Sequence, residues 1–238
     1  MTPDIRWYDS VPSTMDIATA LASQGAPHGV VVAAHQQTAG RGRRGSTWAS
    51  PAGAGLYFSF IARPRDARRI PLLTLAAGVG VRDGVRSATG LNSDLKWPND
   101  LLVDRKKLAG ILAEGHALGS CDEAVVIGVG VNVQPAAYPP DVTARATSIE
   151  GELGRAIDRD LLLSEILDGL QHRLLTLSQN PGDILQAWRA ASPSAIGTRV
   201  EWDGRHGITA GIDERGALLV KTATGLERLI AGQIHWNL

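Results

Sequence analysis

The chain has 238 residues, of which 44% are hydrophobic, enough for one large core or for a large domain with a small companion. Its 24 basic and 24 acidic side chains balance, which excludes a global charge that would attract nucleic acid or a membrane surface. The single cysteine, Cys121, excludes a disulfide framework and a thiolate-rich zinc site.

The first half of the chain predicts two helices and two strands. Residues 1–10 do not combine a basic segment with an apolar run, and no segment approaches the roughly 18 apolar residues of a membrane helix, so we expect a soluble, cytoplasmic protein. Ser13 followed by Asp16 predicts a capping box. The predicted elements are a helix that ends at Ser23, a strand over 29–37, a strand over 55–64, and a helix over 70–89 that stops before Gly90.

The second half predicts a hairpin, a third apolar strand and two more helices. From Pro193 onward the pattern changes to short alternating strands separated by glycine turns, which predicts a separate small β-barrel of about 45 residues. The predicted elements before it are a strand entering a turn over 93–100, a hairpin over 101–115, a strand over 124–133, a proline-bearing loop over 134–148, a helix over 159–178 and a shorter helix over 182–191.

Helices and antiparallel strands mix here without the regular alternation of a βαβ fold. This pattern predicts an α+β class, with a mixed or antiparallel sheet flanked by helices. We expect a main domain over residues 1–191 and a small C-terminal barrel over residues 192–238.

The stretch GRGRRG, residues 40–45, fits the dinucleotide-binding fingerprint G-x-G-x-x-G letter for letter. That site requires a helix beginning at the last glycine and an acidic residue about 20 positions further on for the ribose. Pro51, Gly53 and Gly55 disfavour a helix there, and three guanidinium groups would crowd the positive helix end. We therefore attribute the match to chance.

Arg41, Arg43 and Arg44 suit a different anion, because guanidinium groups bind carboxylate and phosphate through paired hydrogen bonds. The glycines between them let the backbone approach a ligand. Such a loop repels itself when empty and becomes ordered when an anion arrives. The alternative is a solvated basic loop that binds nothing.

A second unusual motif, KWPND at residues 96–100, is followed by KKLAGIL at 106–112. A hairpin that folds this segment back brings Lys107 near Asp100, which places an ammonium group beside a carboxylate. The alternative is an ordinary turn with a surface lysine.

Taken together, these motifs resemble those of the biotin protein ligases. GRGRRG followed by W and SP, then KWPNDLLV, KKLAGIL and GVGVN, occur in the order and approximate spacing of that family, and the resemblance covers essentially the whole chain. It implies a catalytic domain with the fold of class II aminoacyl-tRNA synthetases and a C-terminal SH3-like barrel. It also implies two steps: biotin attacks the α-phosphate of ATP with Mg²⁺ to give biotinyl-5′-AMP, and a lysine of a biotin carboxyl carrier domain then displaces AMP.

The resemblance also implies roles for single residues, with no metal ligand assigned to the protein. The expected catalytic residues are Lys107, Arg41 and Asp100. The expected biotin-binding residues are Ser13, Thr14, Met15, Gln37, Gly40, Arg41, Gly42, Arg43, Lys107 and Gly110. The expected nucleotide-binding residues are Arg41, Arg43, Arg44, Trp48, Asn99, Lys107 and Asn132, with Trp48 or Tyr138 stacking on adenine.

Two of these positions carry open questions. Ser13 is expected to meet the ureido ring of biotin, yet it is equally suited to cap a helix. Met15 stands where the family usually has asparagine, so a polar contact is lost there or supplied elsewhere. The glycines within 110–115 and 128–132 suit close approach to biotin, with tight strand packing as the alternative.

The expected macromolecular partner is the biotin carboxyl carrier domain of a carboxylase, and the chain is expected to be a monomer or a homodimer. The serine–threonine pair begins at residue 13, which leaves no room for the N-terminal operator-binding domain of bifunctional members, so we expect no transcriptional role. Because the charges balance, we expect no nucleic-acid or membrane partner. One alternative is a lipoate or octanoate ligase of related fold, against which KWPND and GRGRRG argue. The other is a nucleic-acid-binding protein, which the zero net charge disfavours.

Overall fold

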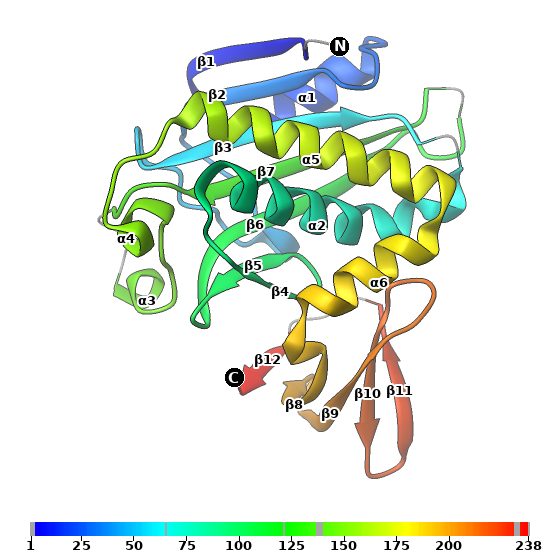
Figure 1. Ribbon diagram of the computed structural model, residues 1–238. Coiled ribbons are helices and arrows are strands. Elements are labelled where there is room, and N and C mark those ends of the chain that lie inside the picture. The colour runs from blue at the N-terminus through cyan, green and yellow to red at the C-terminus, as the bar shows by residue number, and fades with distance from the viewer. Residues whose placement is uncertain (1–2, 65, 121, 137–139, 231–233, 238) are drawn as a thin grey trace.

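The structure is a computed structural model that describes the chain except residues 1–2, 65, 121, 137–139, 231–233 and 238. A large sheet packs against helices, and a small second sheet follows at the C-terminal end (Figure 1). The large sheet contains β1 (Ile5–Val11), β2 (Val31–Gln37), β3 (Gly55–Ala62), β4 (Asp94–Lys96), β5 (Asp100–Val103), β6 (Lys106–His116) and β7 (Ala124–Asn132). The helices are α1 (Thr14–Ser23), α2 (Ile70–Thr89), α3 (Pro140–Thr143), α4 (Ile149–Leu153), α5 (Arg159–Gln179) and α6 (Pro181–Ala191). The small sheet contains β8 (Ile196–Trp202), β9 (Arg205–Ile212), β10 (Leu218–Thr222), β11 (Gly225–Leu229) and β12 (His235–Asn237).

The large sheet has the strand order β1-β2-β3-β7-β6-β5-β4. Strands β1 and β2 run parallel and are connected through α1, whereas the remaining neighbours are antiparallel. The expected mixed sheet is therefore confirmed, with one parallel unit that the sequence analysis did not predict. Strand β1 itself was missed because most of its side chains are exposed or half-buried, so no alternating apolar pattern marks it.

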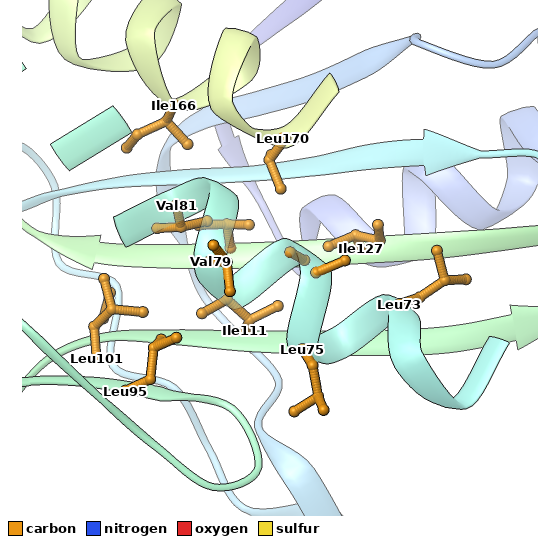
Figure 2. Packing of buried hydrophobic residues seen from close by; sticks show 14 of the residues in the cluster. Leu73, Leu75, Val79, Val81, Leu95, Leu101, Ile111, Ile127, Ile166 and Leu170 are labelled. Atoms are coloured by element: carbon orange, nitrogen blue, oxygen red, sulfur yellow. The ribbon is translucent and has the colours of Figure 1, made fainter. Parts of the chain in front are cut away.

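The central strands are buried on both faces because helices cover both sides. Helices α2 and α5 lie side by side across one face, and α1 covers the other (Figure 1). Figure 2 shows side chains of the first interface, among them Val79 of α2, Ile166 of α5 and Ile127 of β7, which belong to one buried cluster. On the α1 side, Ala18 packs over Val126 of β7. This double burial explains why β3 and β7 read as continuous apolar runs.

Glycines set the close approach of α2 and α5. A Cβ atom added at Gly84 would lie 2.4 Å from the Cα atom of Ile166, and one added at Gly80 would lie 2.8 Å from the carbonyl oxygen of Gly169. Any side chain at these points would therefore separate the two helices. At the end of α2, Gly90 has a φ of 77°, which confirms the predicted stop.

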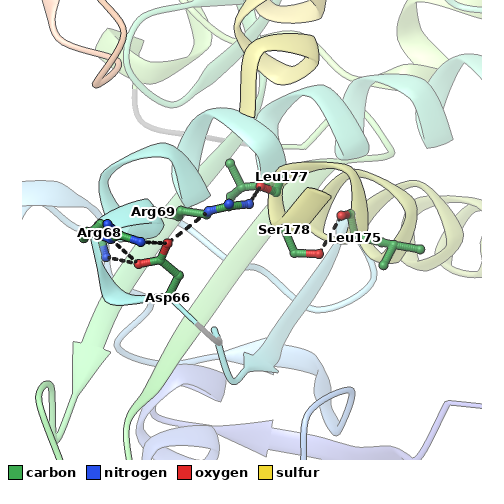
Figure 3. A network of polar contacts seen from close by, with 6 residues as sticks. All are labelled: Asp66, Arg68, Arg69, Leu175, Leu177 and Ser178. Carbon is green, nitrogen blue, oxygen red and sulfur yellow. Dashed lines mark hydrogen bonds and ion pairs between the residues drawn. The ribbon is translucent and has the colours of Figure 1, made fainter. Parts of the chain in front are cut away.

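Polar contacts join the start of α2 to the end of α5 (Figure 3). Arg69 donates to the carbonyl oxygen of Leu177 at 2.5 Å and to the carboxylate of Asp66 at 3.3 Å. The hydrogen bond from Arg68 lowers the pKa of Asp66 to about 2. A guanidinium at the last carbonyls of α5 also opposes the negative end of the helix dipole.

The small sheet docks through the predicted KWPND turn. The indole nitrogen of Trp97 is buried and donates to the carbonyl oxygen of Gly216 at 2.9 Å. The strand order is β11-β10-β9-β8-β12, so the antiparallel C-terminal sheet is confirmed. Within the described residues its edge strands β11 and β12 do not pair with each other, so the sheet is open there rather than the closed barrel we expected.

The predicted helices and the strands of the large sheet match the observed elements to within a few residues, apart from β1. The segment 134–148, predicted to be a loop, includes the short helix α3, and α4 follows it. Cys121 and Tyr138 lie outside the described residues. None of the described helices has both the length and the apolar character required to cross a bilayer. The division into domains at residues 191 and 192 stays a prediction.

Two glycines of α2 give a matched test of the helix interface. Gly84→Ala should lower the free energy of unfolding by about 1–3 kcal/mol or more, because its Cβ atom meets the backbone of α5. Gly78→Ala should instead raise it by roughly 0.5–1 kcal/mol, since its Cβ atom only touches the side-chain tip of Leu95 at 3.4 Å and alanine favours helix. Urea unfolding of both variants measures the difference; equal effects would contradict this packing.

Candidate active site

A cavity of about 340 Å³ opens between the start of α1, the loop after β2, and strands β6 and β7. The smaller sheet closes one side of it. Most residues expected from the sequence line this cavity: Ser13, Thr14, Met15, Gln37, Arg41, Gly42, Arg43, Arg44, Trp48, Asn99, Asp100, Lys107 and Gly110. Gly40 and Asn132 lie outside its wall.

The loop over residues 40–48, here called the arginine loop, folds as a narrow hairpin. The amide of Trp48 donates to the carbonyl oxygen of Gly40 at 2.9 Å, and the amide of Gly42 donates to that of Ser46 at 2.7 Å. Its tip turns through Arg44, which has a φ of 54°. Residues 46–54 form no helix before β3, which agrees with our rejection of a dinucleotide site.

A neutral hydrogen-bonding network forms one end of the cavity. The side-chain oxygen of Gln37 accepts from the amide of Thr14 at 2.9 Å, and its nitrogen donates to Ser50 at 2.8 Å. The Thr14 hydroxyl is 2.8 Å from that of Ser59. Ser13 caps α1 by accepting from the amide of Met15 at 3.3 Å, which confirms its capping role. It also lines the cavity, and its contact with a ligand stays a prediction.

Bare glycines form the floor. Gly110 and Gly130 are direct partners on β6 and β7, and Trp48 lies against both of them. A Cβ atom at Gly130 would lie 2.4 Å from the indole nitrogen of Trp48, which is buried and has no hydrogen-bond partner among the described residues. A ligand that lies on this floor must therefore displace the indole ring.

Met15 takes part in packing at the position where the resembled family usually has asparagine. Its side chain is buried in the cluster beneath α1, with Ala18 and Val126. A Cβ atom at Gly128 would lie 2.7 Å from its sulfur atom, so the thioether covers that glycine directly. The polar contact of an asparagine is thus replaced by an apolar one.

A cluster of cations around one carboxylate forms the other end. Lys107 lies 2.6 Å from Asp100, which confirms the pair predicted from the hairpin, and Lys96 lies 4.0 Å from the same carboxylate. Burial lowers the pKa of Lys96, and the charge of Asp100 opposes that shift. Burial likewise lowers the pKa of Arg43, again opposed by Asp100. Asp100 therefore neutralises several cations that an incoming anion would also attract.

Backbone contacts fix the position of Lys107. Its amide donates to the carbonyl oxygen of Arg145 at 2.7 Å, and its carbonyl oxygen accepts from the amide of Thr147 at 3.0 Å. The buried amide of Asn132 donates to the carbonyl oxygens of Lys107 at 3.3 Å and of Thr147 at 2.9 Å. Asn132 thus orients the strand that carries the lysine.

Asn99 holds the turn of the KWPND segment against β6. Its side-chain amide donates to the carbonyl oxygen of Ile111 at 2.7 Å, and the amide of Ile111 donates back to the carbonyl oxygen of Asn99 at 2.9 Å. This reciprocal pair fixes Asn99 at the cavity wall, next to Asp100.

Arg41 does not point to this cationic end. Its guanidinium forms ion pairs with Asp16 at 3.1 Å and with Glu114 at 3.2 Å. From the sequence, Asp16 was expected only as part of a helix cap, and no role was expected for Glu114. Trp236 of β12 was also missed; it lines the cavity with its ring 5.9 Å from the nitrogen of Lys96. No local pattern indicates a contact between residues so far apart in the chain.

The arrangement suits an elongated ligand. Hydroxyl and amide groups at one end fit a neutral polar head, the glycine floor fits a flat apolar middle, and the cations fit an anionic tail that meets a second anion. Among the described residues, no three histidine, cysteine or acidic side chains gather to hold a metal ion. The side chains of Lys107, Lys96 and Arg43 can bring two anions together by neutralising their charge.

The central position of Asp100 can be tested by stability. Asp100→Asn should lower the melting temperature at low ionic strength, because Lys96, Lys107 and Arg43 then lose the carboxylate between them. Added salt should shrink the loss by screening. The control is Asp94→Asn, whose side chain is exposed on the adjacent strand. Equal shifts for both variants in thermal unfolding would contradict the assigned cluster.

Comparison with known proteins agrees with this geometry. Residues 7–132 match the Biotin/lipoate A/B protein ligase family, and residues 205–235 match the Biotin protein ligase C terminal domain. The Bifunctional ligase/repressor BirA of Bacillus subtilis is 37% identical over 96% of this chain and 73% of that protein. The Biotin--[acetyl-CoA-carboxylase] ligase of Paracoccus denitrificans is 34% identical over 87% of this chain and 90% of that protein.

A solved structure shows the same fold over the full length. The biotin protein ligase from Aquifex aeolicus, in complex with biotin and ATP, superposes with a TM-score of 0.82 and is 27% identical; the match covers 100% of this chain and 99% of that one. Sequence match, fold and cavity agree. The chain therefore belongs to the biotin/lipoate A/B protein ligase family.

Proposed function

We propose that this chain is a biotin–[acetyl-CoA-carboxylase] ligase, which activates biotin with ATP and transfers it to a lysine of a biotin carboxyl carrier domain. The observation that carries the proposal is the polarity of the cavity, with a neutral network at Thr14 and Gln37 and the Lys107–Asp100 pair at the other end. Biotin has the same polarity, because its ureido ring is neutral and its carboxylate is charged. The names of the similar proteins support the same substrate.

In the first step, a carboxylate oxygen of biotin attacks the α-phosphorus of ATP and pyrophosphate leaves. Both reactants are anions, so the main obstacle is their mutual repulsion. Lys107 offsets it at the reacting atoms, and Lys96 and Arg43 lie close enough to share the charge that develops on the phosphoryl oxygens. The glycine floor and the backbone contacts of Lys107 hold the two groups in line.

In the second step, the lysine amine of the carrier attacks the acyl carbon of biotinyl-5′-AMP and AMP leaves with the bonding electrons. The cations that bound the α-phosphate then stabilise the departing phosphate. Mg²⁺ is proposed to enter with ATP and to draw most of its ligands from phosphate and water. No protein ligand is assigned to it, because Asp100, the single carboxylate among the described residues of the cavity wall, is already paired with Lys107 and Lys96.

The remaining residue roles are part of the proposal. Trp48 or Trp236 would cover the nucleotide, since both aromatic rings line the cavity near a lysine. The catalytic domain would span residues 1–191, with the second domain, 192–238, closing the nucleotide side. We further propose a cytoplasmic enzyme, a monomer or a homodimer, whose macromolecular partner is the carrier domain rather than a nucleic acid or a membrane.

Exchange of labelled pyrophosphate into ATP tests the first step. With Mg²⁺, biotin should support exchange and lipoate or octanoate should not. Lys107→Ala should lower kcat roughly 100-fold to 1,000-fold with a smaller change in the KM for biotin, because its charge counts most in the transition state. Lys106→Ala, the exposed neighbour on the same strand, is the matched control and should retain activity.

The outcomes separate the two ligase branches. Exchange with lipoate or octanoate and not with biotin would replace the proposed substrate. Equal losses in the Lys107 and Lys106 variants would remove Lys107 from the reacting centre. If none of the three acids supports pyrophosphate exchange, the proposed adenylating step is refuted.

A further inference from the structure

We infer that Asp16 and Glu114 are positioning residues that hold Arg41 and thereby fix the base of the arginine loop over the biotin head end. The inference rests on the proposed function, since it assigns these carboxylates to the binding of biotin. Arg41 then binds carboxylates of the protein rather than the ligand. Arg43 is the arginine of the loop that would contact the reacting anions.

One guanidinium joins three separate elements. Arg41 lies in the stem of the arginine loop, opposite Thr47. Asp16 belongs to the first turn of α1, two residues after Thr14. Glu114 lies on β6, on the same face as Gly110, because residues two and four apart along a strand share a face. The ion pairs of 3.1 Å and 3.2 Å thus tie the loop to both the helix and the strand that border the cavity.

The stem of the loop rests directly on the neutral network. A Cβ atom at Gly40 would lie 2.4 Å from the carbonyl oxygen of Trp48, 2.9 Å from the hydroxyl of Ser50 and 3.1 Å from the side-chain nitrogen of Gln37. The stem therefore packs tightly against Gln37, which accepts a hydrogen bond from Thr14. A displacement of the stem would therefore shift Gln37 and Thr14, which lie at the proposed biotin head end.

The two ion pairs of Arg41 favour one position of the arginine loop, and they are exposed enough to break when the loop moves. The side chains of Arg41, Asp16 and Glu114 are 38%, 55% and 41% exposed, so water and salt screen both ion pairs. A loop that must admit biotin and release its product requires contacts of this kind. Its tip is different, since Arg43 is half-buried and faces the charge of Asp100.

Kinetics of Asp16→Asn, Glu114→Gln and the double variant test the inference in the pyrophosphate exchange assay. The double variant should raise the KM for biotin roughly threefold to tenfold, with kcat and the KM for ATP little changed. High salt should shrink the difference from the wild type. Asp168→Asn, an exposed carboxylate on α5, is the matched control and should match the wild type.

Limited trypsin digestion without ligands provides a readout independent of activity. Release of the stem should loosen the backbone at the tip, so the double variant should be cut after Arg43 and Arg44 several times faster than the wild type or the Asp168 control. Mass spectrometry of the fragments locates the cuts.

Equal cleavage rates together with an unchanged KM for biotin would overturn the inference. A lower KM for biotin in the double variant would overturn it too, because the carboxylates would then hold the loop against the ligand. If the wild type shows no exchange with biotin, the proposed function fails, whereas the digestion still decides whether the two carboxylates hold the loop.

Discussion

The ion pair between Lys107 and Asp100 is the contact on which the cationic end of the site depends. Asp100 is only 17% exposed and has Lys107 at 2.6 Å and Lys96 at 4.0 Å, so without it these ammonium groups would repel one another in a poorly solvated space. The pairing of β5 with β6 sets the distance, because it places Lys107 opposite Leu102, two residues from Asp100, and the long side chain of the lysine spans that step. One carboxylate thus holds the cations ready for the anions that the reaction brings together.

The KWPND segment links this chemistry to the architecture. Both Lys96 and Trp97 border the cavity. The buried indole of Trp97 donates to the carbonyl oxygen of Gly216 in the turn between β9 and β10, and the nitrogen of Lys96 lies near the ring of Trp236 on β12. Asn99 secures the turn to β6. A short segment therefore positions the Lys107–Asp100 pair and docks the second sheet, so packing changes at Trp97 should also change the cationic end of the cavity.

Many of the helices and strands, and the Lys107–Asp100 pair, could be predicted because they depend on residues close together in the sequence. The apolar runs of β3 and β7, the period of α2 and α5, and the hairpin that pairs Lys107 with Asp100 follow from residues close in the chain. Strand β1 was missed since an edge strand with exposed side chains has no periodic signature. The partners of Arg41 and the approach of Trp236 depend on tertiary packing, which no spacing in the sequence encodes. Gly40 and Asn132 do not line the cavity but support groups that do, and their expected contacts with ligands stay a prediction.

The orientation of biotin along the cavity is the central claim, and a crystal structure of the complex with biotin tests it most directly. We expect the ureido ring to lie within hydrogen-bonding distance of Thr14 and Gln37 and the carboxylate to point to Lys107. We also expect the ring of Trp48 to have left the floor at Gly130. Biotin bound with its carboxylate at Thr14, or bound while Trp48 still covers Gly130, would contradict it.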